Sequence, residues 1–136
     1  MNKSILYLSA DGRTRLRLRV EGGNIWLNQL EIAELFKTTK QNVSLHIRNI
    51  FEDGELCRGA AIREFLTIQS EGRRQVRRNL IYYNLDLILA IGYRLRSSQG
   101  IQFRQWASIH LREFLHRDFI LNDENPAHTY KQNVMI

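Results

Sequence analysis

The sequence predicts an α+β protein built as a winged helix-turn-helix, with an N-terminal β-hairpin, a second β-hairpin as the wing and two C-terminal helices. Residues 26–51 carry two helical apolar patterns separated by a short break. Residues 5–20 and 62–83 carry β-type patterns with turn residues between them, and helical spacing returns after residue 84. A chain of 136 residues is long enough to bury a core as one domain.

The first hairpin is expected between Ile5 and Val20, with Asp11-Gly12 as its turn. Leu16, Leu18 and Val20 alternate with arginines, so the apolar residues are predicted to face the core. The arginines line the other face: Arg13, Arg15, Arg17 and Arg19. Such a row is usually solvated and discourages edge pairing, although it could also contact phosphates.

The helix-turn-helix is expected between Trp26 and Phe51. Leu30, Ala33 and Phe36, with Ile32 or Leu35 beside them, form the apolar stripe of a first helix. Asn28 with Glu31 has the pattern of a capping box. The small side chain of Ala33 allows the two helices to cross at close range. A break of three residues, Lys37 to Thr39, then separates this helix from the next.

The second helix is predicted to begin after Thr39, whose side chain caps it, and to bury Val43, Ile47 and Ile50. Many helix-turn-helix units place Gly in the turn, where φ is positive, and Lys37 stands near that place at a steric cost. The candidate base-reading residues of the outward face are Lys40, Gln41, Asn42, Ser44 and Arg48. Gln and Asn can bond adenine bidentately and Arg can bond guanine, whereas an ordinary helical hairpin would simply present this face to water.

The second hairpin carries arginines at or near its turn, where they are predicted to hold phosphates: Arg73, Arg74, Arg77 and Arg78. The alternative is a hairpin tip whose charge only promotes solubility. Arg94 and Arg96 are two further phosphate candidates, since they precede a helix start. These two arginines could equally pair with acids such as Asp86.

Two C-terminal helices are expected after this hairpin. Asn84 is predicted to cap a buried apolar helix that ends at Gly92, and residues 93–100 are expected to form a loop. Ser98 is predicted to cap the last long helix, on which His110 lies in the apolar stripe as a packed residue. Residues 1–121 are assigned to one domain and residues 122–136 to a tail or the start of a linker.

The composition favours an anionic partner. The net charge is +6, and residues 73–117 alone contain nine Arg against two acids, a local charge of +7. A single cysteine, Cys57, excludes an internal disulfide, and no apolar run reaches the length of a bilayer. We therefore expect a cytoplasmic protein that has no membrane association.

No cofactor or metal site is expected, because the four histidines and the acids lack metal or catalytic spacing, and an enzyme is not predicted.

Three stretches resemble the RhuM virulence-protein family of prophages and pathogenicity islands: IWLNQLEIAELF, VSLHIRNIFEDGEL and IYYNLDLILAIGYRLRSSQGIQFRQWA. The resemblance spans roughly residues 24–119, and the third stretch is the most specific. It implies an N-terminal module of DNA-binding type, related in style to phage repressor and antirepressor domains. Family members typically continue into a further C-terminal region, which the end of this chain does not match.

The sequence thus predicts a DNA-binding module, specifically a prophage- or island-encoded transcriptional regulator that binds double-stranded DNA. The alternative is an antirepressor-like module that binds another protein regulator. Whether the module acts as a homodimer stays open.

Overall fold

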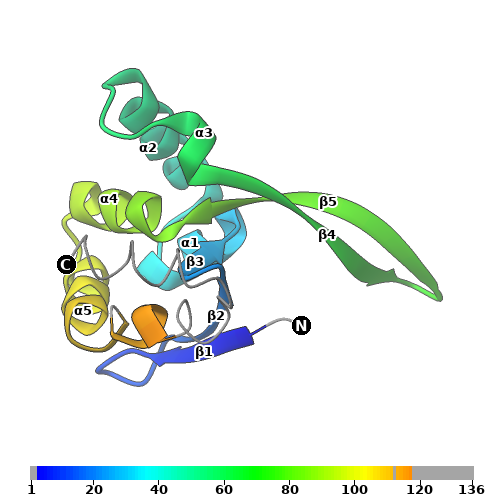
Figure 1. Cartoon of the computed structure of the whole chain (residues 1–136), viewed down its shortest axis with the longest axis horizontal. Coiled ribbons are helices and arrows are strands. Elements are labelled where there is room, and N and C mark those ends of the chain that lie inside the picture. Colours follow the sequence, from blue (N-terminus) through cyan, green and yellow to red (C-terminus); the bar gives the residue numbers. More distant parts are fainter. Residues whose placement is uncertain (1–2, 112, 118–136) are drawn as a thin grey trace, which may run out of the picture.

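The computed structural model describes residues 3–111 and 113–117. The predicted domain boundary after residue 121 and the tail at 122–136 lie outside these residues. Within them, five strands form one antiparallel sheet in the order β1-β2-β3-β5-β4, with helices packed against it (Figure 1). The predicted α+β class is therefore confirmed.

The N-terminal hairpin consists of β1 (Lys3–Leu8) and β2 (Arg15–Glu21), and it forms one end of the sheet. Leu16, Leu18 and Val20 are buried, as their alternation predicts. β3 (Asn24–Leu27) follows after a tight turn and pairs with both β2 and β5, so it connects the two hairpins.

The helix α1 (Gln29–Phe36) begins with the predicted capping box. The Asn28 side chain accepts from the Glu31 backbone N–H at 2.9 Å, and the Glu31 carboxylate accepts from the Asn28 backbone N–H at 2.9 Å. Burial raises the pKa of the Glu31 carboxyl group. The prediction that Leu30 lies on the buried stripe is wrong, since Leu30 is 64% exposed. Ala33 and Phe36 are buried as predicted, and both Ile32 and Leu35 are buried with them, which turns Leu30 toward solvent.

The helix α2 (Lys40–Glu52) follows after a three-residue turn, and the Thr39 hydroxyl caps it by accepting from the Asn42 backbone N–H at 3.1 Å. Lys37 adopts φ 56° in this turn, so a lysine occupies the left-handed conformation that glycine adopts more easily. The backbone N–H groups of Lys37 and Thr38 donate to the last carbonyls of α1, which ends the helix.

A short helix, α3 (Arg58–Ala61), leads into the second hairpin, β4 (Ile62–Glu71) and β5 (Arg74–Asn84). Gly72, with φ 62°, and Arg73 form its two-residue loop. The hairpin is anchored at its base, where β5 pairs with β3, and its outer half extends well beyond the helices (Figure 1). We call residues 64–81, which are all of the hairpin except its base, the arm.

The helix α4 (Leu85–Leu95) is buried as predicted and is capped by Asn84, but it does not end at Gly92. A Cβ atom at Gly92 would lie 2.8 Å from the Phe36 ring, so this glycine allows close packing inside the helix. The helix instead ends at Leu95, and the next residue, Arg96, caps it in the left-handed conformation with φ 52°. Ser97, and not Ser98, then caps the next helix by accepting from the Gly100 N–H at 3.1 Å.

The helix α5 (Ser98–Trp106) continues into one π-helical turn, η1 (Ala107–Leu111), and residues 113–117 are again helical. Phe103, Ala107, Leu111 and Leu115 are buried at intervals of four, because the wider π turn keeps this spacing on one face. The π turn rotates His110 out of the predicted apolar stripe. His110 is exposed, so its assignment as a packed residue is wrong.

Candidate nucleic-acid interface

The outward face of α2 is fixed by the side chains on its opposite face. Val43, Ile47 and Ile50 are fully or nearly fully buried in the core, which sets the rotation of the helix about its axis. Four exposed residues then follow one another at helical spacing: Gln41, Ser44, Leu45 and Arg48. Lys40 is exposed beside them at the N-terminal end of the helix. The structure therefore brings four of the five predicted base-reading residues together on one surface, while Asn42 is half-buried.

Two of the predicted base-reading residues already have partners within the protein. The Asn42 side-chain amide donates to the Thr38 hydroxyl at 2.9 Å, and the Gln29 amide donates to the Ser44 hydroxyl. The sequence did not single out Gln29, because its bond to Ser44 joins two different helices and leaves no local pattern. Of the predicted set, Lys40, Gln41 and Arg48 make no side-chain hydrogen bond to the described residues.

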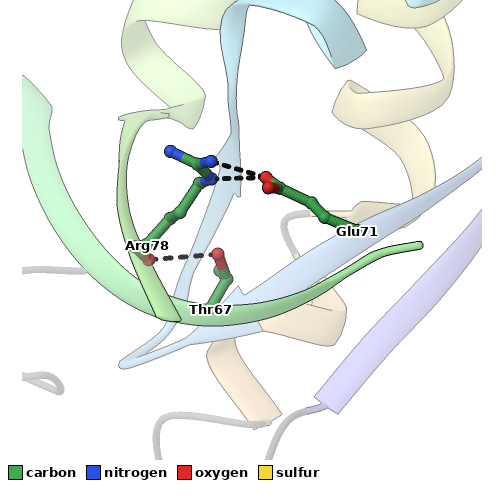
Figure 2. Close-up of polar contacts among 3 residues, drawn as sticks. All are labelled: Thr67, Glu71 and Arg78. Atoms are coloured by element: carbon green, nitrogen blue, oxygen red, sulfur yellow. Dashed lines mark hydrogen bonds and ion pairs between the residues drawn. The ribbon is translucent and has the colours of Figure 1, made fainter. Parts of the chain in front are cut away.

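The four arginines near the hairpin turn do not form a single cluster. The strand register places Arg74 and Arg78 on one face of the hairpin and Arg77 on the other, with Arg73 in the loop. Arg78 pairs with Glu71 through Nε at 2.9 Å and through Nη2, and its carbonyl accepts from the Thr67 hydroxyl at 3.1 Å (Figure 2). Arg73, Arg74 and Arg77 are exposed, and the tip that carries them lies far from α2 (Figure 1).

Arg94 lies close to the C-terminal end of α2 and is held by acids. Its Nη2 atom is 3.0 Å from both Asp53 Oδ2 and Glu55 Oε1, and these contacts raise the pKa of the guanidinium group. The sequence left open whether Arg94 pairs with an acid such as Asp86; the structure supplies two acids from the turn after α2. This pairing reduces the positive charge that Arg94 can offer to a phosphate.

A cleft of about 320 Å³ separates α2 from the end of α4, and Arg96 lies on its wall with Arg94. His46, Asn49 and Tyr93 complete the lining. Burial of His46, together with the nearby positive charge of Arg94, lowers the pKa of the imidazole below its usual value. Arg96 is exposed, whereas Arg94 is paired with acids, so Arg96 is the arginine of this cleft that is open to an anionic ligand.

The outer face of the sheet carries arginines stacked on aromatic rings. The Arg19 guanidinium lies 4.1 Å from the Phe65 ring centroid, and that of Arg63 lies 4.8 Å from the Trp26 ring centroid. The sequence predicted Arg19 as a solvated member of an arginine row. Its contact with Phe65 could not be anticipated, because the strands that carry the two residues are far apart in the chain.

Other kinds of site are not found within residues 3–111 and 113–117. This part of the chain has no group of three or more His, Cys, Asp or Glu side chains arranged to hold a metal ion. Its helices are also too short or too polar to cross a membrane. Cys57 is a free, exposed thiol.

A family model of the virulence protein RhuM family matches residues 60–134, which is just over half of the chain. The chain belongs to the RhuM family. The matched region begins in α3 and includes the arm, α4 and α5, so it confirms the resemblance noted for the last of the three stretches. The helices α1 and α2 precede the matched region. No curated protein and no solved structure matches the chain.

Proposed function

We propose that this RhuM-family chain is a DNA-binding module of a cytoplasmic transcriptional regulator, in which α1 and α2 form a helix-turn-helix and the β4–β5 hairpin is its wing. In this proposal α2 enters the major groove of double-stranded DNA. The exposed arginines of the hairpin contact phosphates farther along the same duplex.

The order of the elements supports the winged-helix part of the proposal. A strand, β3, precedes α1 and α2, and the hairpin β4–β5 follows them, with β5 paired between β3 and β4. A winged helix has this order, because the strand before the two helices joins the hairpin that forms the wing. The left-handed turn at Lys37 and the Thr39 cap set the change of direction between α1 and α2.

The observation that carries the proposal is the exposed face of α2. Gln41 and Arg48 are exposed two turns apart on this face, and no acidic residue occurs in the helix before Glu52. Arg can bond the O6 and N7 atoms of guanine, and Gln can bond the N6 and N7 atoms of adenine. Asn42 is hydrogen-bonded to Thr38 and Ser44 to Gln29, so their expected role is to hold the start of α2 in place. To contact a base, either side chain would have to give up this internal hydrogen bond.

The arm supports phosphate binding at a distance from the groove. Its strands are about 30 Å long at roughly 3.4 Å per residue, which is enough to follow the duplex past the bases that α2 contacts. Arg73, Arg74 and Arg77 are exposed along its outer end, whereas Arg78 is partly neutralised by Glu71. We therefore assign the larger share of phosphate contact to the first three.

The salt dependence of DNA binding tests this assignment. Replacement of Arg73, Arg74 and Arg77 by alanine is expected to weaken binding to every duplex and to lower the slope of log affinity against log salt by about 2–3, since each lost phosphate contact removes about 0.9. The measurement is fluorescence anisotropy of a labelled duplex over a salt series. The matched control replaces Arg13, Arg15 and Arg17, which removes the same charge from the first hairpin.

The control variant is expected to keep the native slope, apart from the small effect of net charge. An equal decrease of slope in both variants would contradict a specific role of the arm, since only the total charge would then matter. A salt-independent affinity of the native chain would contradict DNA binding itself.

A second candidate function is an antirepressor-like module that binds another protein regulator. It is favoured by Leu45, which is 42% exposed in the middle of the α2 face, because an apolar side chain there suits a protein surface better than a base edge that presents hydrogen-bonding groups. Under this function α2 would bind a protein, and binding to duplex DNA would stay weak and independent of sequence.

A further inference from the structure

One face of the arm carries apolar side chains that nothing in the described structure covers. The pairing of β4 with β5 places Leu66, Ile68 and Ile81 on the same face, since Leu66 pairs with Asn79 and Ile68 pairs with Arg77. These three side chains are 60%, 64% and 46% exposed. We call this surface the arm face.

The arm face is the outward continuation of the sheet face that the helices cover. At the base of the hairpin, Ile62 and Tyr83 lie on this same face and pack in the main core. Farther out the helices end, while the hairpin continues away from the body (Figure 1). The apolar pattern of the core therefore extends beyond the layer that would bury it.

The opposite face of the hairpin makes contacts within the chain. Near the base Phe65 and Tyr82 pack with Trp26, and farther out Arg78 pairs with Glu71 (Figure 2). A two-stranded hairpin that packs on neither face is only marginally stable in water, so burial of the arm face would also hold the arm in its extended form. Exposed apolar side chains gathered on one surface commonly mark a protein interface.

The charges on the arm face identify the partner. Only two of its residues are charged, Glu64 toward the base and Arg77 toward the tip, and neither makes an ion pair with any residue that the structure describes. They flank the Leu66–Asn79 pair, one pair of residues to each side. If two such faces stack with their arms antiparallel, each Glu64 lies beside the Arg77 of the other copy. If the arms are parallel, each Glu64 instead lies beside the other Glu64, and each Arg77 beside the other Arg77.

We propose that the arm face binds the arm face of a second copy of this chain, with the two arms stacked antiparallel and the two-fold axis close to Leu66. In this dimer Leu66 faces Leu66 of the other copy, and Ile68 and Ile81 pack around the two leucines. At each end of the interface, Glu64 of one copy forms an ion pair with Arg77 of the other. The proposal does not depend on DNA binding. It leaves Arg73, Arg74 and α2 exposed for DNA, and in the dimer Arg77 pairs with Glu64 of the other copy, so only Arg73 and Arg74 of the three exposed tip arginines would then hold phosphates.

Ile68→Glu tests the apolar part of the interface. The substitution places a charge inside the stack, next to the central Leu66, and is expected to weaken self-association of the whole chain at least tenfold. Gln69→Glu is the matched control, because it adds the same charge one residue farther along β4 on the opposite face. Sedimentation equilibrium from about 1 μM to about 500 μM gives the dissociation constants, with circular dichroism as a check on folding.

Exchange of the two charges tests the antiparallel arrangement. Glu64→Arg and Arg77→Glu should each weaken the dimer severalfold, while the double variant should recover most of the native affinity, since it restores opposite charges across the interface. Within one chain the two residues are too far apart along the arm for a direct contact to explain the recovery. A native chain that stays monomeric at the highest concentration would overturn the proposal, as would a dimer that persists unchanged in Ile68→Glu or a double variant weaker than both single variants.

Discussion

Replacing Phe103 with alanine is expected to lower the free energy of unfolding by about 3–5 kcal/mol, the cost of removing a large aromatic side chain from a rigid core. Phe103 is fully buried at the point where α5 meets the sheet and α1. Its ring lies edge-on to Tyr7 at 5.2 Å and to Phe36 at 5.9 Å between centroids. Tyr7 belongs to β1 and Phe36 to α1, so the cavity would affect three elements at once.

Urea denaturation followed by circular dichroism measures this loss. Phe114→Ala is the matched control, because Phe114 is 40% exposed in the helical segment that follows the π turn, and its replacement should cost less than about 1 kcal/mol. A loss at Phe103 no larger than that at Phe114 would contradict the placement of Phe103 at the centre of the core.

Gly100→Ala is the second large effect, with an expected loss of about 1–3 kcal/mol. A Cβ atom at Gly100 would lie 2.6 Å from the Gly92 carbonyl oxygen, so α5 would have to move away from the backbone of α4. Alanine favours a helix over glycine by up to about 1 kcal/mol, which offsets part of this cost but not the backbone clash.

Gly59→Ala separates the clash from the helix propensity in the same denaturation measurement. Gly59 lies in the short helix α3, and a Cβ atom there would meet nothing within 4 Å. We expect Gly59→Ala to leave the free energy of unfolding unchanged or to raise it slightly. Equal stability changes in the two variants would show that the close approach of α4 and α5 is not rigid.

Local patterns in the sequence were sufficient to predict most of the elements. The alternation at Leu16, Leu18 and Val20 predicted β2, and the caps at Asn28 and Thr39 predicted the starts of α1 and α2. These signals succeed because a cap or an alternating strand depends only on residues a few positions apart.

The predictions that failed depend on contacts between distant segments. Gly92 was expected to end α4, whereas it lies inside the helix against Phe36, which is far away in the sequence. His110 was expected in the core, but a π turn changes the phase of the helix, and regular spacing cannot reveal that change.

For the candidate site, the sequence was sufficient to predict the outward face of α2 but not how other segments pack around it. The outward face of α2 follows from the burial of Val43, Ile47 and Ile50, whose spacing is visible in the sequence. The pairing of Arg94 with Asp53 depends on how α4 packs beside the turn after α2, and no local pattern encodes it. The projection of the arm depends on where the helices stop covering the hairpin, which is also a property of the whole fold.

Whether α2 reads DNA bases can be tested by measuring how its variants change the preference of the chain for particular duplexes. Duplexes would first be selected from a random pool with the native chain, and their affinity would be compared with that of scrambled duplexes by anisotropy at one salt concentration. The double variant Gln41→Ala, Arg48→Ala is expected to lose about 1–3 kcal/mol of discrimination for each base contact, while its weak binding to scrambled duplexes persists.

The matched control is Gln105→Ala, Arg15→Ala, which removes the same side-chain types from exposed positions on α5 and β2. We expect this control to keep the native preference and the α2 variant to lose it. If the α2 variant still prefers the selected duplexes as strongly as the native chain, α2 is not the helix that reads DNA.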